Sequence, residues 1–293
     1  KKPIKYSSEK GTFTNYIYPA LQKLYIQNDP YLTSTYILRM HDMINISVLF
    51  TEETIRFMHL NKKKEAVEDE EAKNEETKDS EEIIAKDDEE DETTAVEESP
   101  VDLDSKIEEE IKSACFKIRA QYADQIPVIN HAGTHPEIHE ALVRNFGKIA
   151  KALGSELTEK TVLVHTITYL NDTKYKLSAL EAIIDYVDLL PLNVVDMLLK
   201  PCFERSLYDA DERVVFQSVR GYCKIVKQKK LKSIDPLQII NTFLPLLVHP
   251  NIWIREEILE LICAVIEQLD ILELYTKLQP GLLKYVKKYE VIF

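Results

Sequence analysis

The stretch HPNIWIREEILELICAVIEQL, residues 249–269, contains a break in the chain and the helix that follows it. After His249-Pro250-Asn251, apolar residues recur every three or four positions, which is the spacing of one face of an α-helix. They are Ile254, Ile258, Leu261, Ile262, Val265 and Leu269. Glu256, Glu257, Glu260 and Glu267 lie elsewhere on the helix circumference. The stretch therefore predicts an amphipathic helix that begins directly after a turn.

Two helices joined by a short break recur along the chain. The breaks centre near residues 132, 172, 210 and 250, which are 40, 38 and 40 residues apart. A constant period near 40 with two helices per unit is typical of HEAT and armadillo repeats. The predicted pairs are residues 17–27 and 31–58, 104–124 and 136–153, 157–170 and 174–189, 192–207 and 212–227, and 235–248 and 252–269, and a sixth pair opens at residue 272.

Each predicted pair has an apolar face that it cannot bury alone, so neighbouring pairs must stack on one another. Prolines support the same arrangement, because a proline inside a helix kinks it and four of them fall in first helices. They are Pro19, Pro201, Pro245 and Pro280. We therefore predict an all-α fold class, a HEAT-type α-solenoid of about five to six helix pairs.

An acidic segment interrupts this pattern. Residues 65–100 contain 18 Asp and Glu against three Lys, which accounts for the net charge of −13 and leaves the rest of the chain close to neutral. The segment has no aromatic residue and no helical periodicity, so we expect it to be disordered. The predicted organisation is a first HEAT unit or units over residues 1–60, a disordered acidic insert over 61–102, and continuing repeats of the same solenoid over 103–293.

The four cysteines stand apart from one another and are surrounded by apolar helix residues. They are Cys115, Cys202, Cys223 and Cys263. Buried free thiols are the expected state, which is typical of a reducing compartment such as the cytoplasm. No run of 18 apolar residues occurs, so no membrane-spanning helix is predicted. The first and last residues, Lys1 and Phe293, lack start and stop signals, and we expect the chain to be a segment of a longer protein.

A catalytic or metal site has little support in the sequence. His131, His135 and His139 are four residues apart and could share a helix face that binds zinc, but Pro136 interrupts them. Phosphate-loop, HExxH and GxSxG patterns are missing. We therefore predict no enzyme activity in this segment, no cofactor and no metal, and keep a metal-dependent hydrolase based on these histidines as the alternative from another functional class.

Nucleic-acid binding is also disfavoured. The densest basic cluster consists of Lys224, Lys227, Lys229, Lys230 and Lys232. It lies at the end of a predicted helix, where positive charge interacts favourably with the helix dipole. A solvated helix end explains these lysines better than a phosphate-binding groove does.

The single Trp of the chain, Trp253, falls in the first turn of a predicted second helix and has two interpretations. The favoured one is that Trp253 packs beneath the next repeat, while Arg255 bonds to turn carbonyls or to an Asp of the neighbouring unit. The other is that Trp253, Arg255 and Asn251 form a partner-binding site, since Trp and Arg dominate the energetics of protein interfaces.

Several stretches resemble one protein family. They are residues 53–58 (ETIRFM), 168–172 (TYLND), 200–203 (KPCF), 207–212 (LYDADE), 275–280 (YTKLQP) and, most specifically, 249–255 (HPNIWIR). The resemblance is to the phosphoinositide 3-kinase regulatory subunit 4 family, the vacuolar protein sorting fifteen type of scaffold in the class III phosphatidylinositol 3-kinase complex. In that family a central HEAT region lies between an N-terminal serine/threonine protein-kinase-like domain and a C-terminal WD40 propeller.

The resemblance implies that this chain is the HEAT region, a non-catalytic scaffold and regulatory segment. The implied partners are the class III phosphatidylinositol 3-kinase catalytic subunit and a Beclin-type coiled-coil subunit, with an endosomal small GTPase as a further candidate. The implied location is cytoplasmic, peripheral on endosomal and autophagic membranes through the complex, in vesicle trafficking and autophagy. Neither nucleic-acid binding nor direct membrane insertion is expected. The alternative within the same class is a HEAT adaptor of another system, such as a transport or phosphatase scaffold.

Overall fold

The computed structural model describes residues 29–78, 100–132, 135–232 and 234–286, together with the isolated positions 17, 19, 20 and 23. All regular structure within these residues is helical, and they contain no strand. The predicted all-α fold class is therefore confirmed, whereas the HEAT assignment stays a prediction. None of the described helices has the length and apolar character needed to cross a membrane.

The chain divides into two compact units. One contains Lys1–Gln27 and Asp42–Gln121, and the other contains Asn28–His41 and Tyr122–Phe293. The first unit is formed by most of two long helices, α2 (Pro30–Lys78) and α3 (Pro100–Ala123). They contact each other through a hydrogen bond from the Cys115 thiol to the Val48 carbonyl, 3.9 Å, and through His59 Nε2, which lies 2.7 Å from Glu110 Oε2.

The helices α2 and α3 correct the predicted disorder of residues 61–102 at both its ends. Helix α2 continues to Lys78 and α3 begins at Pro100, whereas residues 79–99 lie outside the described part of the chain. Two physical factors explain the longer α2. Glu, Lys and Ala are strong helix formers, and extending an existing helix avoids the cost of nucleating a new one. Residues rich in charge can therefore extend a helix that has already formed.

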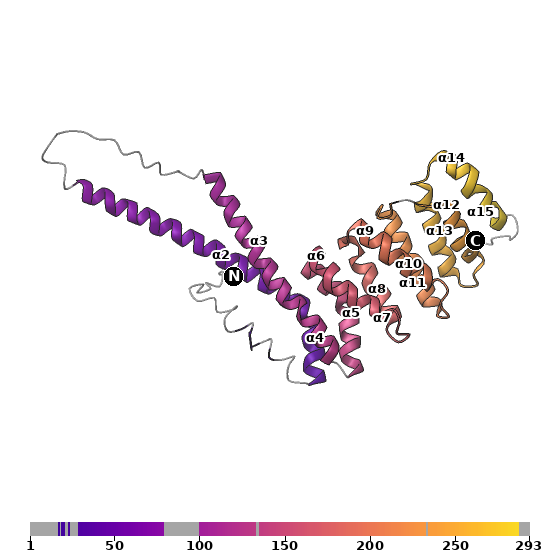
Figure 1. The fold of residues 1–293 in the computed structure, drawn as a ribbon, viewed down its shortest axis with the longest axis horizontal. Coiled ribbons are helices and arrows are strands. Elements are labelled where there is room, and N and C mark those ends of the chain that lie inside the picture. Colours follow the sequence, from indigo (N-terminus) through magenta and orange to yellow (C-terminus); the bar gives the residue numbers. More distant parts are fainter. Residues whose placement is uncertain are drawn as a thin grey trace. The chain divides into compact units, whose positions relative to one another are not determined.

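The second unit contains a row of second helices that pack on one another in sequence order. Helix α5 packs on α8, α8 on α11, and α11 on α13, and Figure 1 shows them following one another along the unit. Their bounds are Pro136–Leu153, Lys176–Tyr186, Glu212–Lys227 and Ile252–Ile266. A short helix, α4 (Gln125–Ala132), precedes α5. The stacking predicted from the apolar faces is thus present within this unit.

The break predicted around Pro127 to Pro136 is shorter than expected. Pro127 lies at the third position of α4, so α4 occupies the first part of the predicted break and ends at Ala132, before α5 begins at Pro136. A proline in the first turn of a helix is tolerated because the N–H that it lacks would have no acceptor there.

The first helices of the pairs from Ser155 onward are composite. The segments are α6 (Ser155–Leu157), η3 (Thr158–Val162) and α7 (Leu163–Tyr169); α9 (Leu192–Val194), η5 (Val195–Leu199) and α10 (Lys200–Ser206); α12 (Pro236–Thr242) and η6 (Leu244–Val248); and α14 (Ile271–Glu273), η7 (Leu274–Leu278) and α15 (Gln279–Val286). Each of η3, η5 and η7 is a π-helical turn, and η6 is a 3₁₀ segment. A further 3₁₀ turn, η4 (Val187–Leu189), follows α8.

The prolines of the first helices lie where the helix changes geometry. Pro201 and Pro280 each follow a π-helical turn by two residues, and Pro245 lies inside the 3₁₀ segment η6. Because proline cannot donate the i→i−4 hydrogen bond, a locally widened or tightened turn is where it costs least. Pro19 is at an isolated described position, so its surroundings lie outside the described residues.

The cysteines only partly match the prediction of buried thiols. All four are free, and Cys115 and Cys223 are buried as expected. Cys202 is half-buried and Cys263 is exposed, so the prediction is wrong for Cys263.

The contact between first and second helices is tight at Gly221. This glycine lies in the interior of α11, and a Cβ atom built on it would be 2.3 Å from Cε1 of Phe203, which is buried on α10. The missing side chain of Gly221 therefore allows the Phe203 ring to fit between α10 and α11.

Replacing Gly221 with Ala tests this close approach. In an ordinary helix interior the change stabilises by roughly 0.5–1 kcal/mol. Here we expect a loss of unfolding free energy of about 1–3 kcal/mol, as is typical of overpacking. Urea unfolding measures the difference, and a double-mutant cycle with Phe203→Leu should show that the smaller side chain relieves part of the loss. A stabilised G221A protein would contradict the packing.

Candidate functional site

The loops that join first to second helices share one hydrogen-bonding arrangement. We call their residues, 170–174, 207–213 and 248–255, the loop ridge. In each loop an Asp or Asn side chain accepts a hydrogen bond from the backbone N–H two residues later, at 2.9 Å for Asp172, 2.9 Å for Asp211 and 3.0 Å for Asn251. These positions are 39 and 40 residues apart, so the arrangement repeats with the period of the helix pairs.

The loop ridge exposes large aromatic and aliphatic side chains. Trp253 is 66% exposed, Ile252 is 53% exposed and Tyr208 is 80% exposed. The favoured prediction that Trp253 packs beneath the next repeat is therefore wrong. Trp253 is the second residue of α13, the position that Arg213 has in α11, and both side chains are exposed.

Asn251 holds this part of the ridge in place. Its Oδ1 caps α13, its Nδ2 donates to Glu212 Oε2 at 3.0 Å, and its backbone N–H donates to His249 Nδ1 at 3.1 Å. The bond to Glu212 joins two loops that are 39 residues apart in the chain. Arg255 is half-buried, and within the described residues its side chain has neither the turn-carbonyl bond nor the Asp partner that was expected.

An ion pair joins the preceding two loops. Lys176, which begins α8, donates to Asp209 Oδ2, and the two side chains are 19% and 22% exposed. Asp209 also accepts the backbone N–H of Asp211 at 2.9 Å. The bond from Lys176, followed by the one from the Asp211 N–H, holds the pKa of Asp209 below its usual value. The carboxylate therefore stays ionised and keeps the loops together at neutral pH.

A second polar cluster connects α4, α5 and α7. His139 Nδ1 lies 2.5 Å from the Tyr169 hydroxyl, which donates to Asn130 Oδ1, and Asn130 Nδ2 lies 3.3 Å from His165 Nδ1. Burial, and then the nearby His131, lowers the pKa of His165. The chain of hydrogen bonds satisfies half-buried polar atoms and offers no activated nucleophile, so its role is to join three helices.

The three histidines of the zinc alternative are dispersed. His131 is exposed at the end of α4, His135 is exposed directly before α5, and His139 is bonded to Tyr169. Among the described residues these three imidazoles do not form a group with atoms at ligand spacing. The geometry therefore gives the metal-dependent hydrolase no support.

One other group has suitable spacing for a metal. The ligand atoms of Cys223, Glu257 and Glu260 lie within 4.8 Å of one another. Burial raises the pKa of the Cys223 thiol to about 11, so the thiol is protonated at neutral pH, whereas a metal needs the thiolate. Lys227 Nζ, 2.7 Å from Glu260 Oε2, supplies a positive charge at the same place. The group is an ion-paired contact between α11 and α13 rather than a metal site.

Lys230 has a structural role that the sequence did not reveal. Its Nζ donates to the carbonyl oxygens of Val187 at 3.1 Å, Asp188 at 2.7 Å and Leu190 at 2.5 Å. These carbonyls follow the C-terminal end of α8, so they accept no hydrogen bond from an N–H of that helix. Lys230 therefore caps the preceding repeat, and its burial there lowers its pKa.

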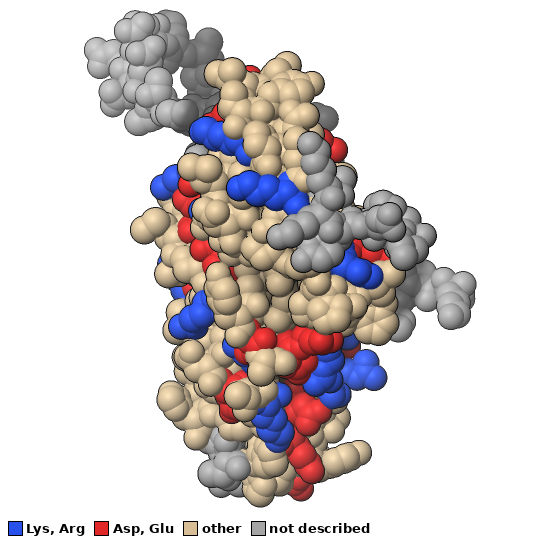
Figure 2. Space-filling model, turned by 90° about the vertical axis from the view of Figure 1, so that its right-hand side faces the viewer, with Lys and Arg blue, Asp and Glu red and all other residues tan. Residues whose placement is uncertain are grey.

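Other lysines of the same cluster are engaged between neighbouring repeats. Lys224 Nζ lies 3.1 Å from Asp188 Oδ2, and Lys227 pairs with Glu260, whereas the remaining two lysines are exposed. Figure 2 shows basic and acidic side chains next to one another on the face that it displays, without a continuous basic area. The arrangement supports the interpretation that these lysines are cations at helix ends, and it disfavours a phosphate-binding groove.

Comparisons with known proteins find a family model that spans nearly the whole chain and relatives that match about half of it. The family model "PIK3R4-like, middle domain" matches residues 4–293. A "non-specific serine/threonine protein kinase" of Candida glabrata is 30% identical over 153 residues, 51% of this chain and 11% of the relative. The "Probable serine/threonine-protein kinase vps15" of Dictyostelium discoideum is 23% identical over 147 residues, 50% of this chain and 8% of the relative. The matches thus cover a small part of each relative.

The ion pair between Lys176 and Asp209 predicts a pH dependence of stability. Because the folded-state pKa of Asp209 lies below its unfolded value, the pair stabilises the fold above about pH 4, and this contribution is lost as the pH falls through the folded-state pKa. We expect Lys176→Met to lower stability at neutral pH and to flatten its decline in acid. Thermal unfolding at a series of pH values measures both effects.

The matched control for this prediction is Lys148→Met, which changes an exposed lysine on α5. The stability of K148M should fall with decreasing pH to the same extent as that of the unmodified protein. An equal decline for K176M and the unmodified protein would show that the pair contributes no pH dependence.

Proposed function

Because this chain belongs to the PIK3R4-like family, as its middle domain, we propose that it acts as a non-catalytic scaffold segment that positions partners in a class III phosphatidylinositol 3-kinase complex. Stacked helix pairs support such a role, since they present an extended surface and each pair contacts only its neighbours. The polar groups described above serve caps, ion pairs and helix contacts, and none of them is arranged for chemistry on a substrate.

The exposed Trp253 is the observation that carries the proposal. A large side chain that is 66% exposed contributes little to the fold, and Trp is among the residues that dominate binding energy at interfaces. Ile252 beside it extends the apolar surface, and Asn251 fixes the backbone of both through its two side-chain bonds. The ridge around Trp253, Arg255 and Asn251 is thus our candidate for a partner contact.

The partners that we propose are the class III phosphatidylinositol 3-kinase catalytic subunit and a Beclin-type coiled-coil subunit. A small GTPase of endosomes is a further candidate. The complex would act peripherally on endosomal and autophagic membranes, in endosomal sorting and autophagy. The relatives are described as serine/threonine kinases, and we infer that the kinase activity belongs to a part of such proteins outside the matched segment.

A HEAT adaptor of a transport or phosphatase system is the second candidate of the same class. It shares the stacked helix pairs, but the family match over residues 4–293 favours the lipid-kinase complex. Purification of the natural full-length protein from its own cells separates the two. Recovery of a lipid kinase in equal amounts supports the first, and recovery of a phosphatase or transport cargo without it supports the second.

Trp253→Ala tests the proposed contact. Because the side chain is mostly exposed, we expect the unfolding free energy to change by less than about 0.5 kcal/mol. Loss of an interface anchor typically costs about 2 kcal/mol or more, roughly a 30-fold weaker Kd. Co-purification and a titration of the lipid-kinase complex measure the affinity, and thermal unfolding measures the stability.

Met197→Ala is the matched control, because Met197 is 68% exposed on η5 and lies outside the loop ridge. It should change neither stability nor binding. Full binding by W253A would remove Trp253 from the interface, and a large loss of stability would show that its role is in the fold.

A further inference from the structure

Helix α4 is connected to both segments that pass from one compact unit to the other. Helix α2 passes between the units at residues 41–42, and α3 passes between them at residues 121–122. One residue separates α3 from α4, and the beginning of α2 is bound to α4 because the Tyr36 hydroxyl donates to Gln125 Oε1 at 2.6 Å. The contacts that hold α4 within the second unit therefore help to anchor both segments there.

Buried apolar side chains hold α4 along its length, and polar bonds hold its C-terminal end. Ile126 and Ile129 are at most 2% exposed. Asn130, which follows them, is half-buried, and its Oδ1 accepts a hydrogen bond from the Tyr169 hydroxyl of α7. Its Nδ2 lies 3.3 Å from His165 Nδ1, also on α7. The last turn of α4 is thus attached to α7 by the two ends of one amide group.

The order of donors and acceptors in these bonds determines where the protons are. Because Asn130 Oδ1 accepts from Tyr169, the Nδ2 hydrogens of Asn130 are directed to His165. The Nδ1 atom of His165 therefore has a lone pair, and the neutral ring carries its proton on Nε2. Burial raises the pKa of Tyr169, so the hydroxyl keeps its proton and remains the donor. Protonation of His165 at Nδ1 would bring two donors against each other.

The surroundings of His165 oppose a positive charge on its ring. Burial, and then the nearby His131 of α4, lowers the pKa of His165, and no carboxylate of the described residues forms an ion pair with it. Helix α7 also packs on α5 and α8, but the titratable and charged groups from that side gather at Tyr169 and the loop behind it. They are His139 of α5, and Asp172, Lys174 and Tyr175 of the loop before α8.

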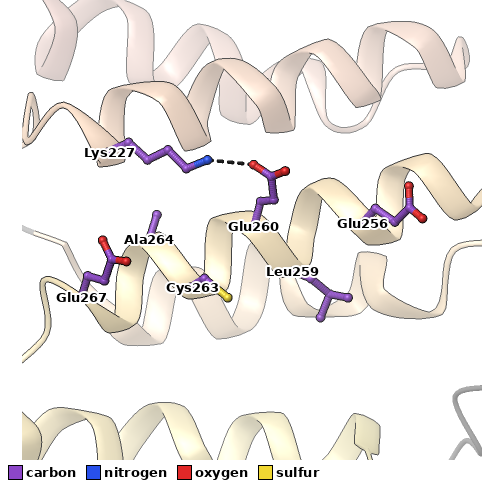
Figure 3. A pocket seen from close by; sticks show the side chains of 7 residues that line it. All are labelled: Lys227, Glu256, Leu259, Glu260, Cys263, Ala264 and Glu267. Atoms are coloured by element: carbon purple, nitrogen blue, oxygen red, sulfur yellow. Dashed lines mark hydrogen bonds and ion pairs between the residues drawn. The ribbon is translucent and has the colours of Figure 1, made fainter. Parts of the chain in front are cut away.

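The ion pair between α11 and α13 keeps its charges over the pH range in which histidine titrates. Figure 3 shows Lys227 reaching Glu260, with Nζ and Oε2 2.7 Å apart. The hydrogen bond between them raises the pKa of Lys227 and lowers the pKa of Glu260. Both groups therefore stay ionised between about pH 5 and 8, where an ordinary histidine changes its charge. This contact is an internal reference for one that depends on imidazole rings.

We propose that His165, Asn130 and His131 form a pH-sensitive switch, in which the neutral His165 ring holds the C-terminal end of α4 on α7 and its protonation, as the pH falls below about 6.5, releases that end. A proton from solvent binds Nδ1, and the hydrogen bond from the Asn130 amide breaks. The switch regulates how firmly the second unit anchors the segments that enter it. It rests on contacts within that unit, so it stands independently of the partners proposed above.

The direction of the pH effect follows from the folded-state pKa of His165. Because this pKa lies below the ordinary value, the unfolded or opened chain takes up the proton more readily than the closed one. The contribution of the switch to stability is fully present above the ordinary pKa of about 6.5. It is lost as the pH falls through the folded-state value.

Hydrogen–deuterium exchange in the natural full-length protein tests the switch. Exchange of α4 and of α13 is compared at about pH 7.5 and about pH 5.5, after correction for the intrinsic rate at each pH. We expect exchange at residues 129–132 to rise about fivefold or more in acid, as loss of one hydrogen bond allows, while α13 stays unchanged. If the Asn130 amide simply turned over and kept both bonds, exchange in α4 would not change, which overturns the proposal. An equal rise in both helices overturns it as well.

His165→Asn separates the switch from a general effect of acid. The asparagine oxygen can accept a hydrogen bond near the place of Nδ1 but does not titrate, so α4 of H165N should be equally protected at both pH values. His131→Asn removes the neighbouring charge from an exposed position and should reduce the rise in acid. A full rise in H165N, or in H131N where H165N does not fold, contradicts the switch.

The matched control is His135→Asn, which changes an exposed histidine directly before α5. Exchange in α4 of H135N should rise in acid to the same extent as in the unmodified protein. Loss of the rise in H135N would assign the pH dependence to another histidine and overturn the proposal.

Discussion

The burial of each second helix beneath the one that follows it is the constraint on which the second unit depends. An amphipathic pair has more apolar surface than it can cover by itself, so its stability comes from the neighbouring pair. Helices α8 and α11 show the result, because equivalent positions 40 residues apart are buried in the same way. The first helices adapt to this row by bending at π-helical and 3₁₀ turns, and the loops between them form the ridge.

Polar contacts between neighbouring repeats fix both ends of the stacked helices. Near their N-terminal ends, Lys176 pairs with Asp209 and Asn251 bonds to Glu212. Near their C-terminal ends, Lys230 binds three carbonyl oxygens of the preceding repeat. Such contacts add geometric specificity to an apolar interface that alone would permit sliding.

The period and the helix pairs could be predicted because they depend on local residues, such as the break His249-Pro250-Asn251 before α13. The exposure of Trp253 and Cys263 could not, because burial depends on which other helix lies against a position, and periodicity does not contain that information. The helical state of residues 61–78 does not follow from their composition, which indicates disorder, because it depends on α2 already being formed upstream. Lys230 was identified as a helix-end cation, but its acceptors lie 40 to 43 residues away.

The π-helical turns of the first helices have a consequence for how this repeat array can evolve. A π turn accommodates one residue more than the α-helical turn that it replaces. A single-codon insertion in a first helix can therefore be absorbed locally, without rotating the residues on either side out of their faces. The stacked second helices have no such turn, so an insertion there would change every contact beyond it. Length variation among homologous repeats should accordingly accumulate in one of the two helices and spare the other.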